Sequence, residues 1–162
     1  MNYHRIEKAD MTNGEGVRVT LYVGGCDHAC KGCYNKSTWN PENGSHFGAK
    51  EVNEVLDLLA PDYISGLSLT GGDPLFSGNL EEINALVEMV RGTYGDTKSI
   101  WLWTGYTFNE IMNQGGNAGR LRRSILKGVD VLIDGKFVQE LHDKKLVWRG
   151  SSNQVIHKFS EF

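Results

Sequence analysis

The chain has 162 residues, of which 40% are hydrophobic, and its formal net charge is −3. This length is typical of one domain, and the near-neutral charge gives no indication of nucleic-acid binding. No apolar run approaches the roughly 18 residues of a transmembrane helix, and the polar N-terminus does not resemble a signal peptide. We therefore expect a single domain over residues 1–162, in the cytoplasm, with no membrane contact and with thiols kept reduced.

Predicted strands and helices alternate along the chain. β-branched and aromatic runs predict strands, and apolar residues three to four positions apart predict helices. In chain order we expect a strand at 17–23, a helix at 50–60, a strand at 64–70, a helix capped by Asn79, a strand at 99–104, helices at 107–112 and 121–127, and strands at 129–133 and 146–149. This alternation predicts an α/β fold with parallel strands covered by helices. A complete barrel usually needs ~250 residues, so we expect a partial (β/α) barrel or an open parallel sheet.

Polar turns that contain glycine or cysteine follow four of the predicted strands. They are the stretch at 24–35, Thr70-Gly-Gly-Asp-Pro, Thr104-Gly-Tyr and Asp134-Gly-Lys-Phe. The carboxyl ends of parallel strands meet at one edge of a sheet, and functional sites gather there. We therefore expect these four turns to form one site.

The three cysteines of the chain, Cys26, Cys30 and Cys33, have the spacing Cys-x3-Cys-x2-Cys. Thiolates bind zinc and iron–sulfur clusters, and clustered cysteines in a reduced protein indicate metal binding or catalysis more often than cross-links. A structural zinc site takes four ligands, and His28 or His46 would have to supply the fourth, at an unfamiliar spacing. Three cysteines would leave one iron of a 4Fe–4S cluster open. The spacing alone favours a cluster and leaves zinc or free thiols as alternatives.

The triplet followed by Tyr34 resembles the signature of the radical S-adenosylmethionine superfamily. Residues 13–21, running into Gly25-Cys26, resemble the start of its glycyl-radical-enzyme activases. The segments 33–39, 101–106, 134–139 and 148–154 resemble one branch of these, the activating proteins of anaerobic (class III) ribonucleotide reductases. The usual Gly-Pro-Gly is Gly14-Glu15-Gly16 here. The resemblance implies a 4Fe–4S cluster on Cys26, Cys30 and Cys33, with S-adenosylmethionine on the open iron.

The resemblance also implies the activity and its partners. Reductive cleavage of S-adenosylmethionine would yield a 5′-deoxyadenosyl radical, which takes a hydrogen atom from a glycine of the reductase catalytic subunit. A reduced flavodoxin would donate the electron. The alternatives are an activase of another glycyl radical enzyme and, in a different class, a non-enzymatic zinc-binding interaction module.

The candidate contacts to S-adenosylmethionine all lie in the four turns. Gly71, Gly72 and Asp73 resemble the Gly-Gly-Glu turn of the superfamily, although glycine and Pro74 also predict an ordinary tight turn. The other candidates are Gly32, Cys33, Tyr34, Thr104, Asp134 and Lys136. Asp134 and Lys136 have the alternative of a solvated turn, and Tyr34 that of an aromatic shield over the cluster. We interpret His28, which has no evident partner in the sequence, as a bystander in the cysteine loop.

Overall fold

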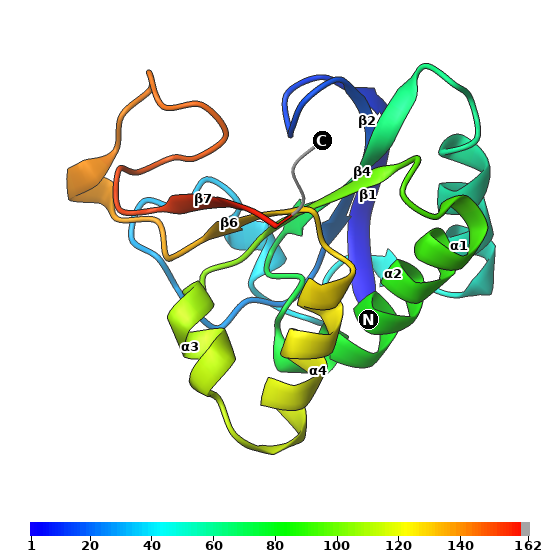
Figure 1. Cartoon of the computed structure of the whole chain (residues 1–162). Helices are drawn as coiled ribbons and strands as arrows, with labels where there is room; N and C mark the ends of the chain where they lie inside the picture. The colour runs from blue at the N-terminus through cyan, green and yellow to red at the C-terminus, as the bar shows by residue number, and fades with distance from the viewer. Residues whose placement is uncertain (160–162) are drawn as a thin grey trace.

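The structure, a computed structural model, describes residues 1–159 and is organised by a seven-stranded sheet (Figure 1). The strand order is β3-β1-β2-β4-β5-β6-β7. The four parallel strands follow one another in chain order and are β2 (Val17–Val23), β4 (Ile64–Gly71), β5 (Ser99–Trp103) and β6 (Val131–Asp134). The antiparallel strands lie outside them and are β1 (Asn2–Asp10), β3 (Ser45–His46) and β7 (Val155–Lys158).

Helices connect the parallel strands and cover one face of the sheet (Figure 1). They are α1 (Ala49–Leu58), α2 (Leu80–Tyr94), α3 (Phe108–Asn113) and α4 (Gly116–Lys127). Helices stay on one face when strands are added in chain order through right-handed crossovers, because each crossover then turns the same way. The α/β class is therefore confirmed, but the sheet is mixed, and in residues 1–159 β3 and β7 form its two edges instead of closing a barrel. None of the described helices is long and apolar enough to cross a membrane.

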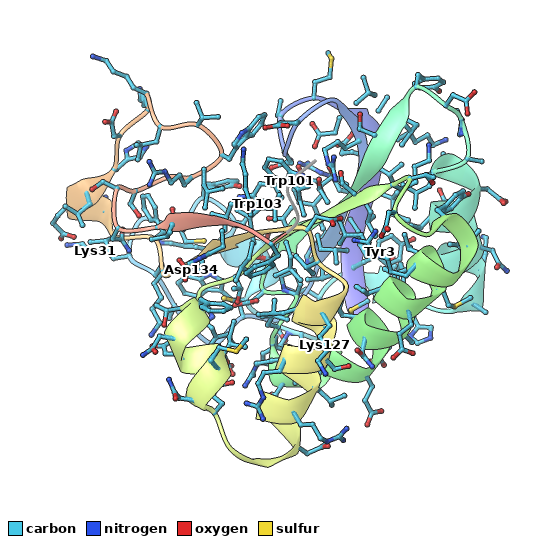
Figure 2. All side chains as sticks on the ribbon, in the orientation of Figure 1. Tyr3, Lys31, Trp101, Trp103, Lys127 and Asp134 are labelled. Atoms are coloured by element: carbon cyan, nitrogen blue, oxygen red, sulfur yellow. The ribbon has the colours of Figure 1, made fainter. Side chains whose placement is uncertain are left out.

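The main hydrophobic core fills the space between the sheet and the helices (Figure 2). Its side chains come from alternate positions of the strands and from one stripe of each long helix, and they include Val19, Leu21, Leu67, Leu69, Ile100, Leu102, Val55, Ile83, Leu86, Val90 and Ile125. Burying one such side chain contributes about 1.5–3 kcal/mol, so this layer supplies the main driving force for folding.

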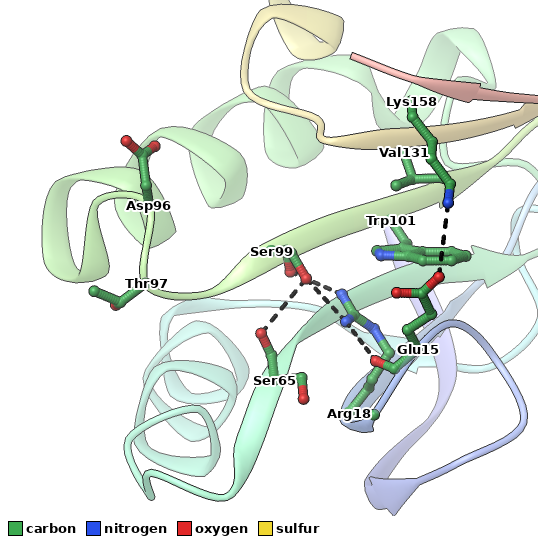
Figure 3. Close-up of a pocket in the computed structure, with 10 residues that line it drawn as sticks. Glu15, Arg18, Ser65, Asp96, Thr97, Ser99, Trp101, Val131 and Lys158 are labelled. Carbon is green, nitrogen blue, oxygen red and sulfur yellow. Dashed lines mark hydrogen bonds and ion pairs between the residues drawn. The ribbon is translucent and has the colours of Figure 1, made fainter. Parts of the chain in front are cut away.

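The opposite face of the sheet carries an aromatic cluster and a buried cation. Trp101 stacks on Trp103, which lies beside it in Figure 2, with ring centroids 5.9 Å apart. The Trp101 and Trp148 rings meet edge to face, with centroids 5.6 Å apart. Arg18 lies beside Trp101 at a pocket of about 340 Å³ and donates to Ser99 Oγ at 2.9 Å (Figure 3). An added Cβ at Gly14 would lie 2.8 Å from Arg18 Cδ, which explains a glycine at that position.

Several predicted elements differ from the structure. The strand expected at 146–149 is wrong, because the last strand is β7 and Trp148, at a φ of 65°, instead packs on the tryptophan cluster. β1 was not predicted, since most of its residues are only partly buried and give no strong apolar pattern. α4 begins at Gly116, upstream of the predicted start. Asn79 does not cap α2 through its side chain, which donates to Gly24 O at 2.8 Å and to Asp73 O at 3.1 Å.

Candidate cluster and cofactor site

The turns after β2, β4, β5 and β6 meet around one cavity of about 150 Å³ at the carboxyl edge of the parallel strands. Most of the predicted site residues line it, namely Cys26, Cys30, Cys33, Tyr34, Gly71, Gly72, Asp73, Thr104 and Lys136. Gly32 and Asp134 are not among the residues that line this cavity. The expectation that four separate turns meet at one edge of the sheet is confirmed.

Backbone hydrogen bonds hold both ends of the cysteine loop. Gly25 N donates to Thr38 O at 2.7 Å, and Cys26 N donates to Trp39 O at 3.1 Å. The three cysteines are free thiols of intermediate exposure. Burial is the largest of the causes that raise the pKa of Cys26 to about 11; a hydrogen bond with the His28 backbone opposes the shift, and Asp73 and the other two cysteines add to it. The protein by itself therefore favours a neutral thiol at Cys26, and a bound metal would supply the positive charge that a thiolate needs.

The donor set fits a 4Fe–4S cluster better than a single zinc ion. Among residues 1–159, no group of three His, Cys, Asp or Glu side chains is arranged to hold one metal ion. The three cysteines of a 4Fe–4S cluster bind different irons, so their thiols surround the cluster and need not converge on one point. His46 lies on β3 and does not line the cavity, and His28 Nε2 is within 2.6 Å of Asp73 Oδ2. The cavity thus offers three thiols without a histidine free to complete a zinc site.

The two glycines at the end of β4, Gly71 and Gly72, allow two turns to pass unusually close together. An added Cβ at Gly71, which has a φ of +114°, would lie 2.5 Å from Val23 N, and one at Gly72 would lie 2.5 Å from Gly25 O. Gly72 N donates to Val23 O at 2.9 Å, and Asp73 N donates to Gly25 O at 2.7 Å. Contacts within the protein therefore already require glycine here, and the same turn presents its backbone to the cysteine cavity.

Asp73 is 2% exposed, and four groups of the protein surround its carboxylate. Oδ1 accepts from Leu75 N at 2.8 Å, and Oδ2 accepts from Thr104 Oγ1 at 2.9 Å and from Gly105 N at 3.0 Å. Because a carboxylate only accepts, His28 Nε2 is the donor of the 2.6 Å contact. Asp73 thus joins the turns after β2, β4 and β5, and the interpretation of His28 as a bystander is wrong.

Asp134 is also held by the protein, although away from the cysteine cavity. Its carboxylate accepts from Phe108 N at 2.7 Å and from Val155 N at 3.2 Å, and it lies 2.9 Å from His157 Nε2. These contacts join the end of β6 to α3 and β7. Lys136, two residues later, is exposed and lines the cavity. Of this predicted pair, the structure therefore brings Lys136 but not Asp134 to the site.

A larger cavity of about 650 Å³ adjoins the first one. The two share Cys33, Tyr34, Thr70, Trp103, Phe137 and Gln154. The larger cavity continues to Gly32, Trp148 and Arg149, and Arg149 Nε is buried there with no hydrogen-bond partner within the described residues. Residue types alone did not identify Trp103, Phe137 and Gln154 as cavity residues. Each of them lies in a segment that carries the family resemblance, at 101–106, 134–139 and 148–154, and that resemblance was the available signal.

Comparison with known proteins agrees with this geometry. A family model described as a 4Fe–4S single cluster domain matches residues 12–157. A relative from Enterobacteria phage T4 is 51% identical over 154 residues, which are 95% of this chain and 92% of the relative. Relatives from Vibrio cholerae and Escherichia coli are each 45% identical, over 99% and 97% of this chain and 99% and 98% of their own lengths. All three are named anaerobic ribonucleoside-triphosphate reductase-activating protein.

The chain belongs to this family. Membership among the anaerobic ribonucleoside-triphosphate reductase-activating proteins confirms the predicted resemblance. The 4Fe–4S domain match spans all three cysteines of the sequence. All three cysteines of this sequence lie in the loop between β2 and β3, so this loop is where the chain offers cysteine ligands to a cluster.

Proposed function

We propose that this chain activates an anaerobic ribonucleotide reductase through radical S-adenosylmethionine chemistry, acting in the cytoplasm as one functional domain over residues 1–162. The observation that carries the proposal is the single cavity lined by three free thiols and the Gly71–Gly72 turn. In a family whose matched domain is a 4Fe–4S domain, such a cavity provides three ligands and leaves one iron for a small molecule.

Each group of cavity residues has a role in the proposal. Cys26, Cys30 and Cys33 hold the cluster. The backbone of the Gly71–Gly72 turn and the loop residues Gly32, Cys33 and Tyr34 position S-adenosylmethionine, and Thr104 and Lys136 offer a hydroxyl and a cation to its polar groups. When bound and given one electron, the cluster and S-adenosylmethionine would supply the radical chemistry that removes a hydrogen atom from a glycine Cα, with methionine as the other product.

Asp73 and Asp134 support the site without being free to bind the cofactor. Asp73 uses its carboxylate to fix the turns around the cavity, and Asp134 fixes the turn that carries Lys136. This supporting role replaces the direct contact first expected for both. Such supports hold the cofactor-facing groups in place, which is what precise hydrogen-atom transfer needs.

The substrate in this proposal is a glycine-bearing segment of the catalytic subunit of the reductase, the enzyme that the names of the relatives specify. The cavity of about 650 Å³ adjoins the thiols and has aromatic walls at Trp103, Phe137 and Trp148, which suits a peptide segment entering beside the cofactor. The electron comes from a separate donor, because the three cysteines of this sequence leave none for a second cluster. The family resemblance implies that this donor is a reduced flavodoxin. The names of the relatives favour this partner over another glycyl radical enzyme.

The test combines metal content with product analysis after anaerobic reconstitution. We expect about four iron ions and about four sulfide ions per chain. We also expect 5′-deoxyadenosine to form when a reductant and S-adenosylmethionine are added. Cys30→Ala should abolish 5′-deoxyadenosine formation, whereas Ser37→Ala, at an exposed position of the same segment, should not. A glycyl radical signal on added reductase completes the test. A colourless protein with one zinc per chain would instead support the zinc-binding module.

A further inference from the structure

His28 lies in the loop between Cys26 and Cys30, and its side chain occupies a small pocket formed by Asp73, Gly105 and Tyr106, which we call the seat. The side chain is 6% exposed. Its Nε2 donates to Asp73 Oδ2 at 2.6 Å, and its ring meets the edge of the Tyr106 ring at a centroid distance of 4.7 Å. Asp73 and Tyr106 follow β4 and β5, so this one side chain connects the cysteine loop to both neighbouring turns.

The seat is built by groups that do not depend on His28. Leu75 N, Thr104 Oγ1 and Gly105 N already fix the Asp73 carboxylate. Gly105 leaves the space that the imidazole occupies, because an added Cβ there would lie 2.3 Å from His28 Cδ2. A carboxylate fixed in this way binds the ring without a cost for ordering its own side chain.

Tyr106, the other wall of the seat, is held from α4. Arg122 Nη2 donates to Tyr106 Oη at 3.1 Å, and the guanidinium lies 4.2 Å from the centroid of the Tyr106 ring. Arg122 is 6% exposed, and its Nε donates to Leu75 O at 2.9 Å. The seat therefore joins the turn after β4, the turn after β5 and a packed helix.

The backbone beside His28 has a conformation that needs such an anchor. Ala29 has a φ of 49°, in the left-handed region, which costs a residue with a Cβ roughly 1–2 kcal/mol. This residue lies directly before Cys30, within the stretch that brings Cys30 back to the cavity that Cys26 also lines. Anchoring His28 opposes relaxation of the loop towards an unstrained shape.

We infer that His28 is a positioning residue that holds the loop from Cys26 to Cys33 in its cluster-receiving shape before the cluster arrives. Asp73, Gly105 and Tyr106 form the seat. The inference rests on the proposed function for the nature of the metal group, but the ordering of the loop does not depend on it. The seat also couples the cysteine loop to the Gly71–Gly72 turn, so the cluster side and the cofactor side of the cavity keep one geometry.

The first measurement uses the reduced, cluster-free protein. His28→Ala should speed hydrogen exchange of the amides at 26–33 by about tenfold or more, which corresponds to about 1.4 kcal/mol of lost ordering. Gly105→Ala, which keeps His28 but fills its seat, should have the same effect. His28→Gln, which can still donate to Asp73, should fall in between. His46→Ala, an exposed histidine on β3, is the matched control and should exchange as wild type does.

The second measurement follows iron release to a chelator after anaerobic reconstitution. Mutation of a residue that positions metal ligands typically lowers metal affinity by about 10–100-fold. The His28→Ala and Gly105→Ala variants should therefore release iron at least about tenfold faster than the wild-type protein. The inference is overturned if the His28→Ala variant exchanges its amides at 26–33 as slowly as the wild-type protein, or if it releases iron as slowly. Failure of the wild-type protein to bind iron would refute the proposed function, whereas the exchange measurement would still decide the role of His28.

Discussion

Arg18 is 1% exposed, yet its guanidinium makes five hydrogen bonds on the face of the sheet away from the helices. Figure 3 shows it beside Glu15 and Ser99. The acceptors are hydroxyl and carbonyl oxygens of Glu15, Ser68, Ser99 and Leu67. Burial lowers the pKa of Arg18 to about 10, and nearby carboxylates only partly oppose that shift. Like Asp73 on the cavity side, this one buried charge joins segments that are distant in the sequence.

Replacing Arg18 should therefore destabilise the whole domain. Arg18→Met leaves several buried acceptors without donors, and we expect a loss of about 3 kcal/mol or more in the free energy of unfolding. Urea unfolding of the cluster-free protein measures this change. Arg5→Met is the matched control, because the Arg5 side chain is 60% exposed and its surface ion pair contributes about 1 kcal/mol or less. Equal unfolding midpoints for the two variants would contradict the argument.

At the scale of elements, β1 connects the core of the sheet to the cysteine loop. It pairs with β2, and Asn2 O accepts from Gly24 N at 2.8 Å, where the cysteine loop begins. The turn between β1 and β2 is organised by Asp10, whose carboxylate accepts from Thr12 N at 2.8 Å, from Asn13 Nδ2 at 2.7 Å and from Thr20 Oγ1 at 2.7 Å. The first strand is thus a support of the site as well as an extension of the sheet.

The Asp10 turn should make stability depend on acid pH. Burial acts to raise the pKa of Asp10, but hydrogen bonds from Thr12, Asn13 and Thr20 outweigh it and hold the pKa below its ordinary value of 3.8. A lowered folded-state pKa stabilises the fold above the unfolded-state value, and this stabilisation is lost as the pH falls through the folded-state pKa. We expect the unfolding midpoint of Asp10→Asn to fall less steeply below pH 3.8 than that of wild type. Thermal unfolding of the cluster-free protein at a series of pH values tests this, and parallel profiles would refute it.

At the scale of the whole molecule, the two faces of the sheet are covered by different parts of the chain. The helices and the aliphatic core cover one face and hold the parallel strands in register. The segment after β6 passes over the other face, where Trp103 Nε1 donates to Trp148 O at 2.7 Å, and it forms much of the wall of the larger cavity. The site therefore lies between the packed core and a covering segment that is mostly turns and exposed or partly buried residues.

Hydrogen exchange should reveal this division. Amides of β4 and β5, in the centre of the sheet, are expected to exchange last, because opening them requires exposure of the main core. Amides at 140–150 should exchange at least about a hundredfold faster, since most of their residues are exposed or only partly buried. Exchange resolved by peptide mass spectrometry provides the comparison. Equal protection of the two regions would show that the covering segment unfolds only together with the core.

The sequence by itself determined the parallel core and the members of the site. The strand predicted at 17–23 is β2 in full, and the helix predicted at 50–60 and the strand predicted at 64–70 are close to α1 and β4. Apolar periodicity is a local property of the chain, so these elements can be derived from neighbouring residues alone. The rule that carboxyl ends of parallel strands share one edge then brought the cysteines, Gly71, Gly72 and Lys136 together.

Only the tertiary structure showed where the flanking strands β1 and β7 lie and which segments the buried polar groups connect. β1 and β7 are sheet extensions whose half-buried residues form no strong apolar pattern, so pairing with β2 and β6 defines them. His28 and Asp73 are 45 positions apart in the sequence, but His28 Nε2 lies 2.6 Å from Asp73 Oδ2 in the fold. A buried carboxylate is assigned its role by the donors around it, and those donors come from turns that meet only after the sheet has formed.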